Sequence, residues 1–218
     1  MELDFKNKNV MIVGAGRSVL DYRDSILKYI DNNNVITIGI NLMTSLCVPD
    51  YHLWTNKKRY IAQNRCISSK SKLLFGSGMS SGLIRRFYKG DYEVVKYINK
   101  SSFDISYDGK VIRGNFRTAG ILAVMVAHLG GCKRIDIVGM DGFTFYDKKD
   151  LKNNKKNQHC WGEGYSDDAD WEKCLKKDDL VYNGLNSLKT YGANFRVLTP
   201  TKFDDFYDST EVVDICQK

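Results

Sequence analysis

Short apolar runs alternate with amphipathic stretches from the beginning of the chain. Residues 9–13 and 35–40 are continuous apolar-rich runs, and between them apolar side chains recur at helical spacing over residues 19–30. Continuous apolar strands are typical of a parallel sheet that is buried on both faces. The tripeptide Gly14-Ala15-Gly16 directly follows the first run. The pattern therefore predicts a strand-helix-strand unit with a glycine turn at its first crossover.

The same alternation continues to the end of the chain, with Asp108-Gly109 marking a hairpin turn. Strands that alternate with helices predict an α/β fold, namely a doubly wound, mostly parallel Rossmann-like sheet with helices on both faces. No low-complexity linker interrupts the sequence, so residues 1–218 are predicted to form a single domain. We expect further strands at residues 51–55, 72–76, 93–98, 104–107, 110–113, 134–139 and 195–198, and helices at 57–63, 118–129 and 168–191.

Two of the later segments have a distinct character. Residues 118–129 are small and apolar on every side, which predicts a buried helix. The stretch from about 143 to 166 is polar and irregular, and we expect it to be a flap over an active site. The helix after it carries an apolar stripe that predicts its core face, made of Leu175, Leu180, Val181, Leu185 and Leu188.

Composition narrows the setting of the protein. The first residues lack the apolar segment of a signal peptide and no apolar stretch reaches membrane-spanning length, so a cytoplasmic location is expected. Six cysteines are scattered without the CxxC spacing of a metal or disulfide framework, and no metal site is predicted. The net charge of +7 suits an anionic partner. The basic residues are spread along the chain, so we expect no nucleic acid partner and leave peripheral contact with the inner membrane face and self-association open.

The glycine turn is the first candidate site. Gly14, Ala15 and Gly16 allow the backbone to approach a phosphate, and the helix that begins near Ser18 offers N–H groups and a positive dipole end. Arg17 adds a positive charge beside them. The third glycine of the dinucleotide fingerprint is missing and no acidic residue ends the second strand, which argues against NAD. The alternative is a tight turn without a ligand.

Polar residues at strand ends form the second candidate group. Asn41, Asn56 and Asp141 each follow a predicted strand, and open α/β sheets bind ligands outside the carboxyl ends of their strands. Asparagine both donates and accepts hydrogen bonds, which suits recognition of a base or a sugar, although each is also a common cap or turn residue. Asp141 is a candidate Mg²⁺ ligand under an alternative function.

Two further features complete the set. Thr118, Ala119 and Gly120 begin the buried helix, where small residues permit close approach of an anion or simply tight helix packing. His159 lies in the irregular stretch, where an imidazole can move protons near neutral pH, although most loop histidines are surface residues.

These blocks resemble the bacterial lipooligosaccharide sialyltransferases, a family of modified Rossmann glycosyltransferases and related surface-glycan proteins. The opening V-M-I-V-G-A-G-R-S is similar to the family's strand and G-x-G-P-S, and residues 118–141 are similar to its T-S-G helix and the strand that ends in G-I-D. The third block is the histidine at 159, followed by a capped helix and a strand that stops at Pro200. The resemblance covers most of the chain in order and spacing, at low residue identity.

The resemblance implies a CMP-activated sugar donor and inverting transfer without a metal or another cofactor. It assigns the cytidine and phosphate to the glycine turn, the strand-end asparagines and residues 118–120, and makes His159 the general base. Tyr146 and Tyr165 are the hydroxyls available to help the departing phosphate. The chain departs from the family pattern at Arg17, where proline is usual, at Ala119, which replaces a serine, and at Phe143, which stands in place of a tyrosine.

The sequence thus predicts a glycosyltransferase that transfers sialic acid or a related nonulosonate from a CMP-sugar donor to a surface-glycan acceptor. One alternative is a Mg²⁺-dependent pyrophosphokinase, since hydroxymethylpterin diphosphokinases resemble the same G-x-G-x-S and G-x-D framework. Another is a non-catalytic module that binds a nucleotide sugar in surface-polysaccharide biosynthesis.

Overall fold

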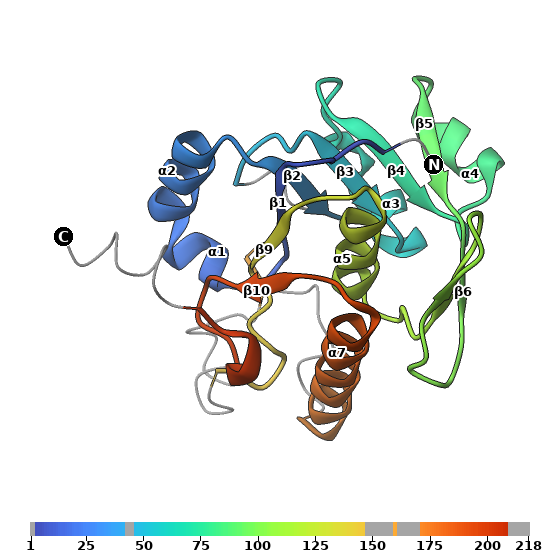
Figure 1. Ribbon diagram of the computed structural model, residues 1–218. Coiled ribbons are helices and arrows are strands. Elements are labelled where there is room, and N and C mark those ends of the chain that lie inside the picture. Colours follow the sequence, from blue (N-terminus) through green and yellow to red (C-terminus); the bar gives the residue numbers. More distant parts are fainter. Residues whose placement is uncertain (1–2, 42–45, 147–158, 161–170, 209–218) are drawn as a thin grey trace.

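The fold is a mostly parallel α/β sandwich with a Rossmann-like sheet. The computed structural model describes residues 3–41, 46–146, 159–160 and 171–208, shown in Figure 1. A seven-stranded, fully parallel sheet forms the middle layer, in the order β10-β9-β1-β2-β3-β4-β5. This confirms the predicted fold class. The strands are β1 (Asn9–Val13), β2 (Ile36–Ile40), β3 (Tyr51–Trp54), β4 (Lys72–Gly76), β5 (Tyr92–Val95), β9 (Arg134–Val138) and β10 (Phe195–Val197).

The first crossover is two helices rather than the single one predicted. Helix α1 (Ser18–Asp21) ends at Tyr22, whose φ and ψ of −113° and 23° lie outside the helical region. Helix α2 (Arg23–Asn33) follows directly. Its C-cap is Asn34, which adopts the left-handed conformation common at helix ends. The apolar spacing continues across the break, which is why the sequence pattern does not reveal it.

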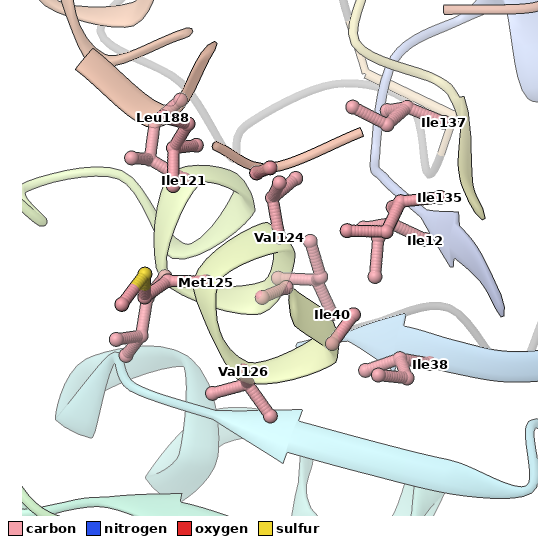
Figure 2. Packing of buried hydrophobic residues seen from close by; sticks show 14 of the residues in the cluster. Ile12, Ile38, Ile40, Ile121, Val124, Met125, Val126, Ile135, Ile137 and Leu188 are labelled. Carbon is pink, nitrogen blue, oxygen red and sulfur yellow. The ribbon is translucent and has the colours of Figure 1, made fainter. Parts of the chain in front are cut away.

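The remaining helices cover both faces of the sheet. Helix α5 (Ala119–Leu129) and α7 (Trp171–Tyr191) lie on one face, and the other carries α1, α2, α3 (Lys57–Gln63) and α4 (Ser81–Phe87). Figure 2 shows the first of these layers, in which Val124 and Val126 of α5 belong to one buried cluster with Ile12, Ile38 and Ile137 of the sheet. Two short 3-10 helices, η2 (Asn64–Cys66) and η3 (Asp204–Phe206), complete the helical elements of the described ranges.

The position of helix α5 in the fold accounts for its small, apolar residues. Every residue from Ile121 to Ala127 is buried, because one side of the helix packs on the sheet and another packs on α7. In α7 the buried positions include a series with three- and four-residue spacing, and Gly184 is buried beside it. The series is Cys174, Asp178, Val181, Leu185 and Leu188. Leu175, expected in the core stripe, is 40% exposed, so that part of the prediction is wrong.

A second, smaller sheet follows β5 in the chain. It contains β6 (Tyr97–Asn99), β7 (Ser106–Tyr107) and β8 (Ile112–Gly114) in the order β6-β8-β7. The Asp108-Gly109 turn joins β7 and β8 as an antiparallel pair, as predicted. The single strand expected at 93–98 is divided at Lys96, so β5 belongs to the main sheet and β6 to the small one.

The chain reverses its direction of sheet growth at β1. Strands β2 to β5 are added on one side of β1, and after α5 the chain returns to place β9 and β10 on the other side. In open α/β sheets the ligand site lies outside the carboxyl ends of the strands at such a switch point. The loops after β1 and β9 are therefore the place to look for a functional site.

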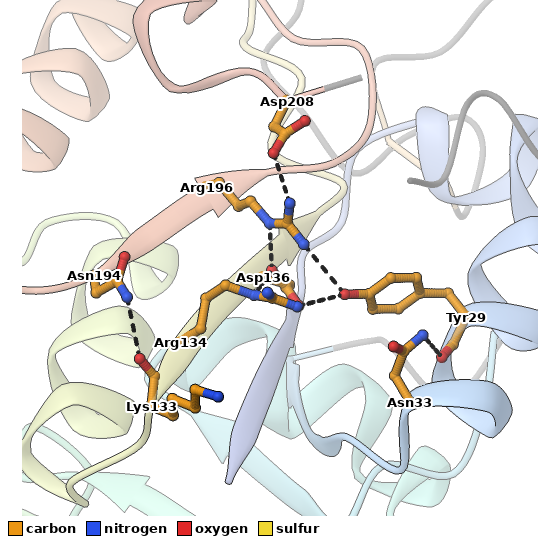
Figure 3. A network of polar contacts seen from close by, with 8 residues as sticks. All are labelled: Tyr29, Asn33, Lys133, Arg134, Asp136, Asn194, Arg196 and Asp208. Atoms are coloured by element: carbon orange, nitrogen blue, oxygen red, sulfur yellow. Dashed lines mark hydrogen bonds and ion pairs between the residues drawn. The ribbon is translucent and has the colours of Figure 1, made fainter. Parts of the chain in front are cut away.

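A buried carboxylate holds the outer strands together on the face that α2 covers. Asp136 of β9 is fully buried and accepts hydrogen bonds from Arg134, Arg196 and the Tyr29 hydroxyl, at 3.0, 2.8 and 2.8 Å. Arg196 of β10 also binds Asp208 at 2.6 Å, as Figure 3 shows. The network connects α2, β9, β10 and the segment that follows β10.

Candidate active site

The glycine turn lies in close contact with the end of β9. The amides of Gly14 and Gly16 donate to the carbonyls of Val138 and Gly139, both at 2.8 Å. A Cβ placed on Gly14 would lie 2.4 Å from the carbonyl oxygen of Gly139, well inside the distance that real contacts allow. The backbones of the two loops touch, and this packing by itself requires a glycine at position 14.

Asp141 occupies the beginning of α1. Its carboxylate accepts the Ser18 amide at 2.8 Å and the Ser18 hydroxyl at 2.5 Å, and a Cβ on Gly16 would lie 2.3 Å from Asp141 Oδ1. The Ser18 hydroxyl is also 3.0 Å from Thr199 Oγ1. Ser18 and Asp141, predicted as separate ligand contacts, are thus bound to each other. The protein's own carboxylate lies where the sequence suggested an external anion.

The surroundings of Asp141 make its carboxyl harder to ionise than that of an ordinary aspartate. The residue is 2% exposed, and burial raises the pKa of its carboxyl from 3.8 to about 6, although the hydrogen bonds from Ser18 act in the opposite direction. The Tyr146 hydroxyl donates to Asp141 Oδ2 at 3.2 Å. Burial and the neighbouring carboxylate also raise the pKa of the Tyr146 hydroxyl far above its usual range. Tyr146 therefore stays a proton donor at physiological pH.

His159 lies directly against the glycine turn. Its backbone forms an antiparallel bridge with Gly16, and the next amide, that of Cys160, donates to the carbonyl of Ala15 at 3.0 Å. The imidazole Nδ1 lies 3.3 Å from the same carbonyl oxygen, and the Phe143 ring stands perpendicular to the imidazole at 6.1 Å. A carbonyl can only accept, so Nδ1 carries the proton in this contact and the lone pair of neutral His159 is on Nε2.

Asn41 and Thr118 place unpaired oxygen atoms at the same end of the sheet. Asn41 follows β2, and Thr118 precedes the first residue of α5 without capping the helix through its side chain. Within the described ranges, Asn41 Oδ1 and Thr118 Oγ1 are buried and have no hydrogen-bond partner. Buried polar atoms are nearly always paired, so such atoms at a strand end and a helix N-terminus are candidate ligand contacts.

Other predicted site residues are engaged locally. Asn56 caps α3, accepting the amide of Arg59 at 3.1 Å, and β3 lies two strands from β1, a separation of about 10 Å. Arg17 pairs with Asp21 at 3.2 Å on the surface of α1. The Cε of Met140 lies close to Gly120, 2.6 Å from where a Cβ would stand. Ala119 is the first residue of α5, and Tyr165 falls outside the described residues, as do 147–158 and 161–166 of the predicted flap.

His52 was not recognised from the sequence. It is fully buried in β3, and its Nε2 forms a hydrogen bond with the carbonyl of Asn41, which has a left-handed φ of 52°. Burial lowers the pKa of the His52 imidazole to about 4, so the ring is neutral. His52 therefore stabilises the strained backbone that presents Asn41. Its position in an apolar strand gives no signal for this role.

Asp178 is the second residue that sequence analysis missed. It is 3% exposed in α7 and accepts the amides of Phe143 and Thr144 at 2.5 and 2.9 Å and the Thr144 hydroxyl at 2.6 Å. These bonds fix the beginning of the predicted flap beside His159. A signal existed, because Asp178 interrupts the apolar spacing of Cys174, Val181 and Leu185.

Neither a metal cluster nor a membrane-spanning helix is found in the part of the chain that the structure describes. Among those residues, no group of three or more His, Cys, Asp and Glu side chains is placed to hold a metal ion. No helix in the same ranges is long and apolar enough to span a bilayer.

Comparisons with known proteins extend the description of the fold. No family model matches the chain, and no curated protein matches it in sequence. Among solved structures, a mammalian sialyltransferase in complex with Gal-beta-1-3GalNAc-ortho-nitrophenol is similar over 89% of this chain and 70% of its own. The TM-score is 0.48 and the sequence identity is 13%. This likeness concerns the arrangement of strands and helices, so the argument for function rests on the site itself.

Proposed function

We propose that this protein is a glycosyltransferase that uses a nucleotide-activated sugar, of the inverting, metal-independent sialyltransferase type. The observation that carries the proposal is the contact between the His159 imidazole and the Ala15 carbonyl, 3.3 Å from Nδ1 to oxygen. This contact places the lone pair of neutral His159 on Nε2, beside the switch point of the sheet. Such a group suits a general base that accepts a proton from a sugar hydroxyl.

The proposed donor is a CMP-activated sialic acid or related nonulosonate, and the acceptor is a surface glycan. The positive end of α5, the Thr118 hydroxyl and the Asn41 side chain would hold the nucleotide and phosphate, because two of their oxygen atoms are buried without a partner in the described ranges. Ser18 contributes indirectly, since its amide and hydroxyl are bound to Asp141.

The reaction follows from these positions. The acceptor hydroxyl attacks the anomeric carbon of the donor while His159 Nε2 takes its proton, and the bond from that carbon to the phosphate oxygen breaks with its electron pair leaving on CMP. Tyr146 donates its hydroxyl proton to Asp141 in this structure, so it would have to turn from that carboxylate to donate a hydrogen bond to the departing phosphate. Release of CMP and of the lengthened glycan completes the cycle.

The Mg²⁺-dependent alternative depends on Asp141, and the site gives it no specific support. Both Asp141 oxygens already accept hydrogen bonds from Ser18, and the residue is 2% exposed. A metal would have to turn this carboxylate away from α1. The other alternative, a non-catalytic module, would bind the same nucleotide sugar at the same site but would not transfer the sugar.

The decisive experiment compares His159→Ala with the wild-type protein. We expect CMP release from CMP-N-acetylneuraminic acid in the presence of a mixed glycan acceptor to fall by about 10² to 10⁴-fold, because the general base is lost. Binding of CMP, measured as a thermal shift, should be retained. The matched control is His128→Ala on α5, whose ring packs on Tyr191 at 5.7 Å, away from the glycine turn.

Three results would count against the proposal. Wild-type turnover in His159→Ala removes the catalytic assignment. CMP binding without turnover in the wild-type protein favours the binding module. Stabilisation by ATP only when Mg²⁺ is present, without a response to CMP or UDP, favours phosphoryl transfer.

A further inference from the structure

A surface groove lies between the second half of α7 and the loop that joins β6 to β7. Its volume is about 500 Å³, and its walls come from Asn183 to Tyr191 on one side and Phe103 to Ile105 on the other. Asn183 and Thr190 follow Asp178 by five and twelve residues, which places them about 8 and 18 Å further along the helix axis. The groove is therefore separate from the candidate active site.

The helical wall of the groove presents neutral polar groups. Asn183, Asn186 and Thr190 recur at three- and four-residue spacing, so their side chains share one face of α7. None of these three side chains has a hydrogen-bond partner among the residues that the structure describes. Ser187 differs, because its hydroxyl donates to the Asn183 carbonyl at 2.9 Å. Two carboxamides and one hydroxyl are thus available to a ligand.

The remaining walls add aromatic surface and a single charge. Phe103 and Tyr191 line the groove, and the perpendicular contact with His128 at 5.7 Å supports the Tyr191 ring. Asp104 is the only charged lining residue, and no ion pair reaches it within the described ranges. The chain has 33 Lys and Arg residues, but none of them lines the groove. The walls of the groove therefore offer no positively charged side chain to pair with a phosphate or another anionic ligand.

We propose that this groove is a second, non-catalytic binding site for a neutral oligosaccharide. Carboxamides both donate to and accept from sugar hydroxyls, a carboxylate accepts from them, and aromatic faces pack against the apolar side of a sugar ring. The groove combines all three kinds of group without a positive charge. The inference does not depend on the proposed catalytic activity.

The test uses the full chain and three neutral probes: lactose, maltotriose and chitotriose, each up to 20 mM. Saturation-transfer NMR detects the contact, and side-chain amide shifts in ¹⁵N spectra locate it. We expect at least one probe to saturate and to shift the Asn183 and Asn186 carboxamides. The double variant N183A/N186A should weaken that binding at least about tenfold, because two hydrogen-bonding groups are lost.

The control variant is Asn32→Ala, an exposed helical asparagine on α2, which should bind like the wild-type protein. Circular dichroism of N183A/N186A verifies that the fold is intact, and CMP added to saturation should not displace the probe. The inference is overturned if no probe saturates, if binding survives in N183A/N186A, or if CMP competes with the sugar. The first two outcomes do not involve CMP, so this inference can fail whether or not the protein binds CMP or transfers sugar.

Discussion

At the scale of single residues, Asp141 takes the place at the glycine turn that a bound phosphate would be expected to occupy. A short glycine motif before a helix is usually interpreted as a cradle for phosphate. In this chain the helix is only four residues long, and its first amide is taken by an internal carboxylate. The glycines at 14 and 16 are then needed because the loops after β1 and β9 come into contact. Under the proposed function, the nucleotide would contact Asn41 and Thr118 rather than the amides of the glycine turn.

Asp141 should give the protein a measurable pH dependence of stability. Its pKa is about 6 in the folded protein against an ordinary 3.8, so between these values the folded state binds more protons than the unfolded chain. The free energy of unfolding therefore falls as the pH rises from about 4 to about 6, by roughly 3 kcal/mol from this group. The measurement is urea unfolding at half-unit intervals from pH 4 to pH 7.

The variant Asp141→Asn isolates this contribution. Asparagine does not titrate and can still accept the Ser18 amide, so the pH-dependent loss of stability between pH 4 and 6 should disappear. Asp31→Asn, at an exposed position of α2, controls for the general effect of removing a carboxylate. If Asp141→Asn retains the wild-type dependence on pH, then the pKa of Asp141 in the native protein is not raised above that of the unfolded chain.

Sequence analysis found the parts of the site but not their connections. Strand ends and helix starts indicate residues 14–18, 118–120 and 141, whereas His159 is indicated by its imidazole in the irregular stretch. The bond between Ser18 and Asp141 joins residues 123 positions apart, and it exists because β9 lies next to β1. That neighbourhood depends on sheet order, which local periodicity does not encode. His52 is missed for the same reason, since its partner Asn41 follows the neighbouring strand β2.

At the scale of elements, α7 connects the hydrophobic core to the candidate active site. Val181, Leu185 and Leu188 anchor the helix in the core, whereas Asp178 on the same face binds the backbone of Phe143 and Thr144. Phe143 in turn packs on His159 and lies under the Lys177 ammonium, which is 4.8 Å from the ring centre. A change in α7 is therefore transmitted to the surroundings of the proposed base.

Replacing Asp178 should loosen the beginning of the flap without unfolding α7. In Asp178→Asn the side chain can accept through one oxygen only, so one of the two amides, that of Phe143 or that of Thr144, loses its acceptor and its hydrogen-exchange protection. The unpaired groups should also lower the free energy of unfolding by about 1–3 kcal/mol. Hydrogen exchange followed by NMR measures the first effect and urea unfolding the second.

The neighbouring residue provides a matched control for this prediction. Asp179 is exposed, so Asp179→Asn changes the charge of α7 equally and should leave both measurements unchanged. Full protection of Phe143 and Thr144 in Asp178→Asn would show that these bonds do not hold the segment in solution.

At the scale of the whole molecule, the elements were more predictable than their order. The expected ranges of β1, β2, β4, α3 and α5 agree with the structure within one residue, because continuous apolar runs and turn residues mark them clearly. The position of β9 and β10 on the far side of β1 has no local signal. The division between β5 and β6 is likewise set by which sheet each half joins.

The buried carboxylate of Asp136 should contribute strongly to holding β10 against β9. β10 has only three residues. Within the described ranges it pairs with β9 and, through Val197, forms one isolated bridge to Tyr207, so few backbone bonds hold it. Arg196 compensates by joining Asp136 to Asp208, while Arg134 and Tyr29 complete the network. Removing one partner of a buried ion pair leaves uncompensated charge, and the cost of doing so is about 3–5 kcal/mol.

We therefore expect Asp136→Asn to lower the free energy of unfolding by about 3 kcal/mol, as measured by urea denaturation at pH 7. Asp24→Asn removes a carboxylate that is 97% exposed and lies 3.5 Å from Arg23, and it should have almost no effect. A double-mutant cycle with Arg196→Met tests the coupling, because residues in one buried network do not contribute additively. If the two substitutions add within about 0.3 kcal/mol, the network does not act as a unit and backbone pairing must hold β10 instead.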